Sequence, residues 1–209
     1  LIGRKQYREA LHVLQKVLRE EPGMPAAIYL TALCHYHLDQ DFRALEVLGE
    51  LRGRPLQGDV RTHVNALRQK IRHVIMMRLV LESLIAVATE DFGEVLDKAR
   101  GVVRSDPEFA MGHFILTGLL LRADRTDEAQ TAGEEALAHC KGEDALRIRM
   151  LLDQVRSRGL LERMKPARTD YHKGRYAAAR KRLNRLPSEY HDLPLFRCFD
   201  GYLESLSGK

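Results

Sequence analysis

The residues best suited to metal binding lie in the segment Cys34-His35-Tyr36-His37. Thiolate and imidazole groups are ligands that Zn²⁺ prefers in proteins. On a helix, His35 and His37 point about 200° apart and are poorly placed to share one ion, whereas Cys34 and His37 lie on one face. A single pair of this kind is more often a packed thiol beside a histidine at the edge of a groove. We therefore expect neither a metal nor another cofactor.

The sequence contains no motif that predicts catalysis: no phosphate-binding loop, no nucleophile elbow and no paired zinc spacing. We expect no catalytic residue and interpret the chain as a non-enzyme. Residue 1 is Leu rather than Met, so we expect these residues to be a piece of a longer chain. One alternative is then a regulatory domain of a larger enzyme, or part of a secretion or signalling assembly, with any catalytic domain outside these residues.

The segment from 163 to 185 is rich in Lys and Arg, and the acidic residues near it in the sequence are Glu162 and Asp170. Such a cluster can bind an acidic protein segment, an anionic polymer or nucleic acid if its charges share one face. The other interpretation is an ordinary solvated helix surface. Neighbouring basic residues fan around a helix, and only two tyrosines are interleaved, so nucleic acid is the least favoured partner. The candidate basic patch is Lys173, Arg175, Arg180, Lys181, Arg182 and Arg185.

The composition is that of a helical globular protein without a membrane segment. The 209 residues are 44% hydrophobic and 30% charged, with a net charge of +5 and a mean hydropathy of −0.34. No apolar run approaches the roughly 18–20 residues that a membrane span needs. The three cysteines, Cys34, Cys140 and Cys198, are far apart and suggest no disulfide framework, which favours a reducing compartment. We expect a cytoplasmic location.

A repeated helix pattern runs through the chain. The stretch YREALHVLQKVLREEP at 7–22 is echoed by FGEVLDKARGVVRSDP at 92–107, 85 residues later. Small or aliphatic anchor residues stand at positions 10, 44, 95, 129 and 179, so the intervals are 34, 51, 34 and 50. A period of about 34 residues, with small residues, aliphatic residues and a proline turn, is typical of a helix–turn–helix repeat.

These residues resemble the tetratricopeptide repeat family. The resemblance rests on Tyr7-x-x-Ala10-x3-Leu14-x2-Val17-Leu18-x3-Pro22, on Phe92-x-x-Val95 through Pro107, on Ala129 with Ala136-Leu137, and on Gly174-Arg175-Tyr176-x-x-Ala179. The segments 25–38 and 109–122 match less well, because they lack the family's tryptophan and leucine-glycine. The resemblance implies an all-α, right-handed solenoid of helix pairs and a role in binding other proteins.

The 51- and 50-residue intervals predict an extra helix in each half of the array. The inserts are 59–75 and 144–159, each after a glycine, with Asp59 and Asp144 as N-cap candidates. Because no glycine or proline occurs between Gly58 and Gly93, residues 59–89 form either one long helix or two helices with a corner near Met76. We expect 11–12 helices in a single solenoid over 1–209, with sub-modules at 1–75, 76–160 and 161–209.

The resemblance places the partner-binding surface on the concave face, which the first helix of each repeat lines. The Lys and Asn residues with which some family members hold a terminal carboxylate are replaced by Tyr29, Leu33 and Leu81. We therefore expect apolar anchors to bind a protein or peptide segment, as an adaptor, scaffold or chaperone-like module would, with acidic residues of the partner steered by the basic C-terminal third. Packing of the same side chains on one another is an equally weighted alternative. The candidate partner-binding residues are Tyr29, Leu33, Tyr36, Val80, Leu84, Val87, Met111, Phe114, Leu121, Met164, Arg168 and Tyr171.

Overall fold

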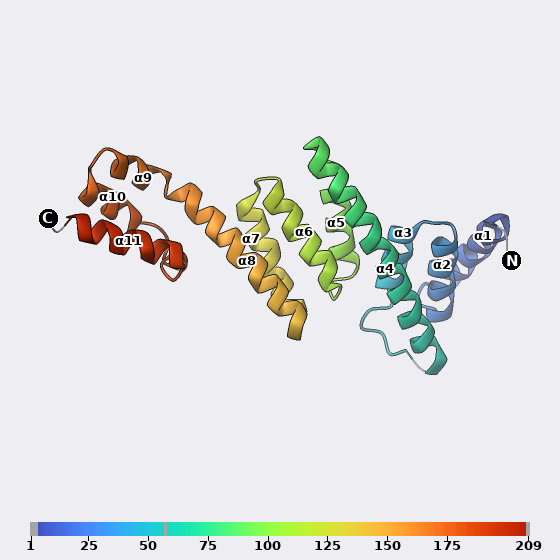
Figure 1. Ribbon diagram of the computed structural model, residues 1–209. Coiled ribbons are helices and arrows are strands. Elements are labelled where there is room, and N and C mark those ends of the chain that lie inside the picture. The colour runs from blue at the N-terminus through green and yellow to red at the C-terminus, as the bar shows by residue number, and fades with distance from the viewer. Residues whose placement is uncertain (1–3, 57, 208–209) are drawn as a thin grey trace.

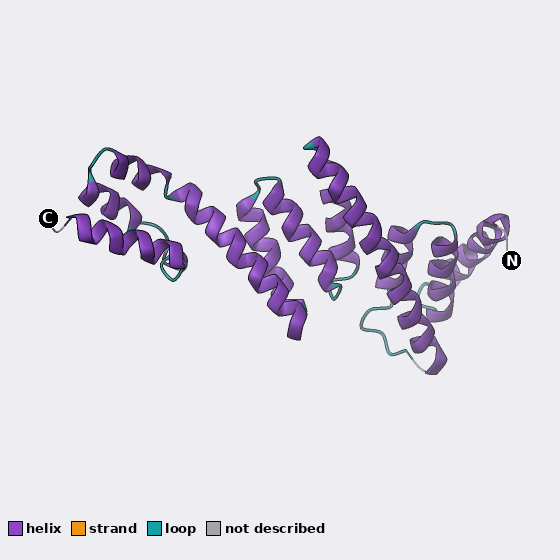
Figure 2. Cartoon of the chain, in the orientation of Figure 1, coloured by secondary structure: helices purple, strands orange, loops and turns teal. Residues whose placement is uncertain are grey.

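The computed structural model describes residues 4–56 and 58–207, and within these ranges every regular element is a helix (Figures 1 and 2). The eleven α-helices confirm the all-α class that the sequence predicts. The helices are α1 (Arg4–Glu20), α2 (Pro25–His37), α3 (Asp41–Gly49), α4 (Gly58–Thr89), α5 (Gly93–Ser105), α6 (Ala110–Arg122), α7 (Thr126–His139), α8 (Gly142–Arg163), α9 (Lys165–His172), α10 (Tyr176–Leu183), the 3₁₀ helix η1 (Ser188–Tyr190) and α11 (Pro194–Ser207).

The helices from α1 to α8 form an array of two layers. The A layer consists of α2, α4, α6 and α8, which contact one another in succession, and the B layer consists of α1, α3, α5 and α7. Each helix also packs against the next one in the sequence, so the chain alternates between the layers. In Figure 1, α6 and α8 lie in front of α5 and α7. Stacking of this kind buries apolar faces that no single helix pair could bury alone.

The backbone confirms the repeat spacing that the anchors predict. A residue with positive φ ends each turn from a first helix to a second helix, five positions before the anchor. The φ values are 59° at Asp39, 58° at Glu90, 59° at Asp124 and 72° at Gly174. The corresponding anchors, Ala44, Val95, Ala129 and Ala179, are all buried. The left-handed residue reverses the chain, and the small anchor allows the two helices of a pair to approach closely.

The first inserted segment is the N-terminal half of α4, which is one continuous helix of 32 residues. The alternative with a corner near Met76 is therefore wrong, because the main core runs along the helix on both sides of that position. Asp59 and Asp144 lie in the first turns of α4 and α8 rather than at their N-caps. The sub-module boundary expected after residue 75 falls inside α4.

The second copy of this long element is divided into α8 and α9. Pro166 occupies the position that corresponds to Leu81 in α4, 85 residues earlier. Proline has no backbone N–H and its ring clashes with the preceding turn, so the helix ends at Arg163 and a new one begins at Lys165. The break directs α9, α10 and α11 away from the array (Figure 1). These helices share a separate core with Leu160 and Met164 at the end of α8.

Candidate partner-binding surface

The C-terminal half of α4 carries a continuous apolar face that is not covered by the described chain. We call this face the α4 ridge. On the opposite side of the helix, Ile75 and Leu79 are fully buried in the main core. A helix that is apolar on all sides is normally buried on all sides, whereas this one leaves its outer apolar face exposed. The ridge consists of Met77, Val80, Leu81, Leu84, Ile85 and Val87, whose side chains are 40–64% exposed.

Two ion pairs hold the ridge in place and remove its charged residues from its surface. Arg78 lies 3.0 Å from the buried carboxylate of Asp41 at the start of α3. Burial raises the pKa of Asp41, and Arg78 opposes that rise. Glu82 accepts a hydrogen bond of 3.0 Å from Lys98 of α5. The helix is thus fixed by its neighbours, while its apolar side chains point outward.

A second apolar surface lies between α6 and α8. Phe114 on α6 is 39% exposed and lines a shallow pocket of about 240 Å³ together with Met111 and Ile148. Asp144 and Arg147 supply its polar edge. On α8, Leu146 and Met150 are also exposed. Among the described residues, the exposed large apolar side chains of the array lie on A-layer helices, except for Val13 on α1 and Met24 in the turn between α1 and α2.

The predicted partner-binding residues fall into three groups. Val80, Leu84, Val87, Phe114 and Arg168 are exposed. Met164 is only 2% exposed and packs in the C-terminal core, so its side chain cannot contact a partner, and we leave it out of the surface. The half-buried residues, which pack partly against the cores, are Tyr29, Leu33, Tyr36, Met111, Leu121 and Tyr171.

Sequence reasoning missed half of the α4 ridge. Met77 and Ile85 were not among the candidates, and Leu81 was considered only as a position without a clamp residue. The signal that could have found them is the composition of residues 74–88, in which apolar residues occur at every angle around the helix. Such a segment must be either buried on all sides or partly uncovered, and its sequence does not distinguish the two.

Half of the basic patch is held in ion pairs with acidic residues. Arg180 pairs with Asp200 at 3.1 Å and Glu204 at 3.0 Å, both on α11. Arg182 donates to the buried Asp170 at 2.5 Å, and Arg175 lies 3.9 Å from the same carboxylate. Among the described side chains, no ion pair involves the remaining three basic residues, Lys173, Lys181 and Arg185. The prediction considered only the nearby acids Glu162 and Asp170 and therefore missed the pairing of Arg180 with Asp200 and Glu204.

The Cys34 and His37 pair does not form a metal site. Cys34 is buried, and burial raises the pKa of its thiol. The ring of His37 instead stacks on Tyr7 of α1, with 4.6 Å between the ring centroids. In residues 4–56 and 58–207, no group of three or more His, Cys, Asp or Glu side chains could hold a metal ion. None of the described helices is both long enough and apolar enough to cross a membrane.

The fold is a helical-repeat solenoid, and the α4 ridge is an apolar face that the described chain leaves uncovered. Residues 1–71 match the family model of the tetratricopeptide repeat, and over these residues the predicted family is confirmed. No curated protein sequence matches the chain.

Two solved structures are similar to the chain at low identity. One is TTC0263, a thermophilic TPR protein of Thermus thermophilus, with 17% identity, a TM-score of 0.31, and coverage of 98% of this chain and 92% of that one. The other is the TPR2AB domain of yeast Sti1 in its pHSP90 complex, with 12% identity, a TM-score of 0.32, and coverage of 97% and 80%. At these TM-scores neither structure carries an argument about shape or binding.

Proposed function

We propose that the chain is a non-enzymatic protein–protein interaction module, an adaptor or scaffold that holds a segment of a partner protein on its A layer. The observation that carries this proposal is the concentration of exposed large apolar side chains on A-layer helices, above all on the α4 ridge. An apolar surface of this size on a rigid helix is expensive to leave in water and stabilises a complex when it is covered.

The chemistry of the surface favours a partner with apolar anchors. Met77, Val80, Leu84 and Val87 follow the alternating three- and four-residue spacing by which one helix packs on another. Helix-in-groove recognition uses anchors of the same kind. Ion pairs hold Arg175, Arg180 and Arg182, which is half of the basic patch, so we do not propose nucleic acid as a partner.

Affinity capture from a lysate of the source cells tests this function. We expect Leu84→Glu/Phe114→Glu to lose proteins that the unaltered chain retains, because a charge at each anchor opposes burial against an apolar partner. The matched control is Val13→Glu, which changes an equally exposed apolar residue on the B layer and should retain the same proteins. Circular dichroism of both variants must first show unchanged helical content. Identical capture by all three proteins would contradict the proposal.

A further inference from the structure

We propose that the α4 ridge packs against the α4 ridge of a second copy of the chain, with the two helices antiparallel. This inference rests on the proposed function, because it takes the ridge as a protein-binding surface, and it names one partner for it. The exposed fractions of Leu81 and Leu84, 60% and 64%, place the centre of the contact between these two residues.

The exposed apolar area is sufficient for a dimer. Six large side chains that are each about half exposed present roughly 500 Å² of apolar surface, near the upper end of what a monomer leaves uncovered. Two such ridges facing each other would bury at most roughly 1,000 Å², the minimum for a specific interface and below the roughly 1,200–2,000 Å² of stable ones. The ridge alone therefore supports a weak dimer.

The ridge is complementary to itself when it is reversed. A two-fold axis between Glu82 and Ser83 brings Leu81 opposite Leu84 of the second copy, and the same operation brings Leu84 opposite Leu81. Further from the axis, Met77 faces Ala88, so the longest apolar side chain meets the smallest one. Val80 likewise faces Ile85. Five of the six ridge residues thus have an apolar counterpart, while Val87 falls opposite Arg78.

Charge does not oppose this contact. The chain has a net charge of +5, which would repel a second copy if basic residues faced one another. Within residues 76–88 the charged side chains are Arg78 and Glu82, and each is held by an ion pair inside its own molecule, with Asp41 and Lys98. The charges next to the contact are therefore neutralised within each copy, including Arg78, which lies opposite Val87 of the second copy.

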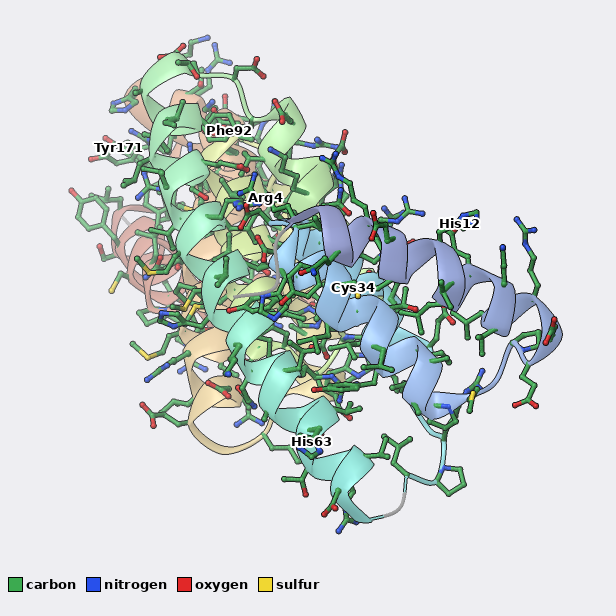
Figure 3. The ribbon with its side chains drawn as sticks, turned by 90° about the vertical axis from the view of Figure 1, so that its right-hand side faces the viewer. Arg4, His12, Cys34, His63, Phe92 and Tyr171 are labelled. Atoms are coloured by element: carbon green, nitrogen blue, oxygen red, sulfur yellow. The ribbon has the colours of Figure 1, made fainter. Side chains whose placement is uncertain are left out.

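The ridge is accessible to another helix. In Figure 1 the C-terminal end of α4 extends beyond α5 and α6 at the top of the view. Figure 3 shows α4 along its length, from His63 near its beginning to Phe92 just past its end, with α1 and α2 on the other side of the view. The end of α4 that carries the ridge therefore projects from the array.

Sedimentation of the purified protein tests the dimer. We expect the unaltered chain and the Val13→Glu control to sediment mainly as dimers at roughly 100 µM, and Leu81→Glu/Leu84→Glu to sediment as a monomer with unchanged helical circular dichroism. The dissociation constant should rise at least about a hundredfold, because four carboxylates would be buried at the centre of the contact. A monomeric unaltered chain, or a variant that still dimerises, would overturn the inference.

Disulfide trapping tests the antiparallel contact without adding charge. Leu81→Cys/Leu84→Cys in a Cys198→Ser background should form a species of twice the chain mass on a non-reducing gel, and Val13→Cys in that background should not. Absence of the 81–84 link between copies would overturn the stated arrangement. A monomeric chain that still loses captured proteins on Leu84→Glu/Phe114→Glu would refute the dimer but not the proposed function. If the unaltered chain is a dimer but Leu84→Glu/Phe114→Glu still captures the same proteins, the proposed function is refuted and the dimer is not.

Discussion

His113 is a buried imidazole on α6 whose ionisation is linked to folding. Its Nε2 hydrogen-bonds to the Pro107 carbonyl at 2.8 Å, and its ring stacks near His139 of α7, with 6.0 Å between the ring centroids. Burial lowers the pKa of His113 below its ordinary value of 6.5, and His139 lowers it further, against the opposing effect of the Pro107 hydrogen bond and nearby carboxylates.

The unfolded chain therefore binds a proton at this site at higher pH than the folded chain does. Stability from the neutral imidazole is fully present above about pH 6.5 and is lost as the pH falls below that value. We expect His113→Gln, which keeps a donor for the Pro107 carbonyl, to show a smaller drop in Tm between pH 7.5 and 5.5 than the unaltered chain. Melting curves of both proteins across this pH range measure the change. An equal dependence of Tm on pH in the two proteins would contradict the prediction.

Leu33 and Phe114 are two apolar residues that differ in burial, so substitutions there distinguish a core position from a surface position. Leu33 packs against the main core, whereas Phe114 is exposed beside its shallow pocket. We expect Leu33→Glu to lower the free energy of unfolding by about 2 kcal/mol or more, and Phe114→Glu to change it by less than about 1 kcal/mol. Urea titrations of both variants measure these values. Equal losses would show that Phe114 is a core residue.

The repeat anchors could be predicted from the sequence, whereas the continuity of α4 and the pairing of Arg180 could not. The anchors at 44, 95, 129 and 179 could be predicted because their small size and period follow from local packing. The continuity of α4 could not, because it depends on which neighbours cover residues 71–79. The pairing of Arg180 with Asp200 was also out of reach, because it requires the path of α11.

The turn between α9 and α10 requires a residue in the left-handed region. Gly174 has φ of 72°, and a Cβ there would meet no atom within 4 Å, so strain at this site comes from the backbone alone. We expect Gly174→Ala to destabilise the protein by about 1 kcal/mol. Gly101→Ala, in the middle of α5 with equally open space, should instead stabilise it by up to about 1 kcal/mol. Thermal melts measure the Tm of both variants. A Tm change of the same sign in both would contradict the prediction.

A buried ion pair fastens α4 to the end of α5. Arg72 donates two hydrogen bonds, of 2.7 and 2.8 Å, to Asp106, and the two side chains are only 16% and 6% exposed. Asp106→Ala leaves a buried guanidinium unpaired, so we expect a loss of about 3–5 kcal/mol. Glu143→Ala, which removes an exposed pair with Arg147, should cost less than about 0.5 kcal/mol. Urea midpoints compare the two, and a small loss for Asp106→Ala would refute the role of the pair.

The molecule as a whole contains two regions with separate hydrophobic cores. Helices α9 to α11 have their own core, and they join the array mainly at the end of α8. Leu183 is fully buried in that core, so we expect Leu183→Ala to cost about 2–5 kcal/mol locally. Amide hydrogen exchange should accelerate in residues 165–207 and stay unchanged in α2 to α6. Faster exchange throughout would show that the two regions unfold together.

The recurrence of the left-handed turn at Asp39 and Asp124 gives the chain a natural unit of growth. Both turns have φ of 59°, and both are followed five positions later by a buried alanine. A block of 85 residues cut between these turns begins and ends in the same backbone conformation, so a genetic duplication or deletion of that block would join without strain. The length of the array can therefore change by a whole step of this size, and each added step moves the C-terminal helices further from the α4 ridge.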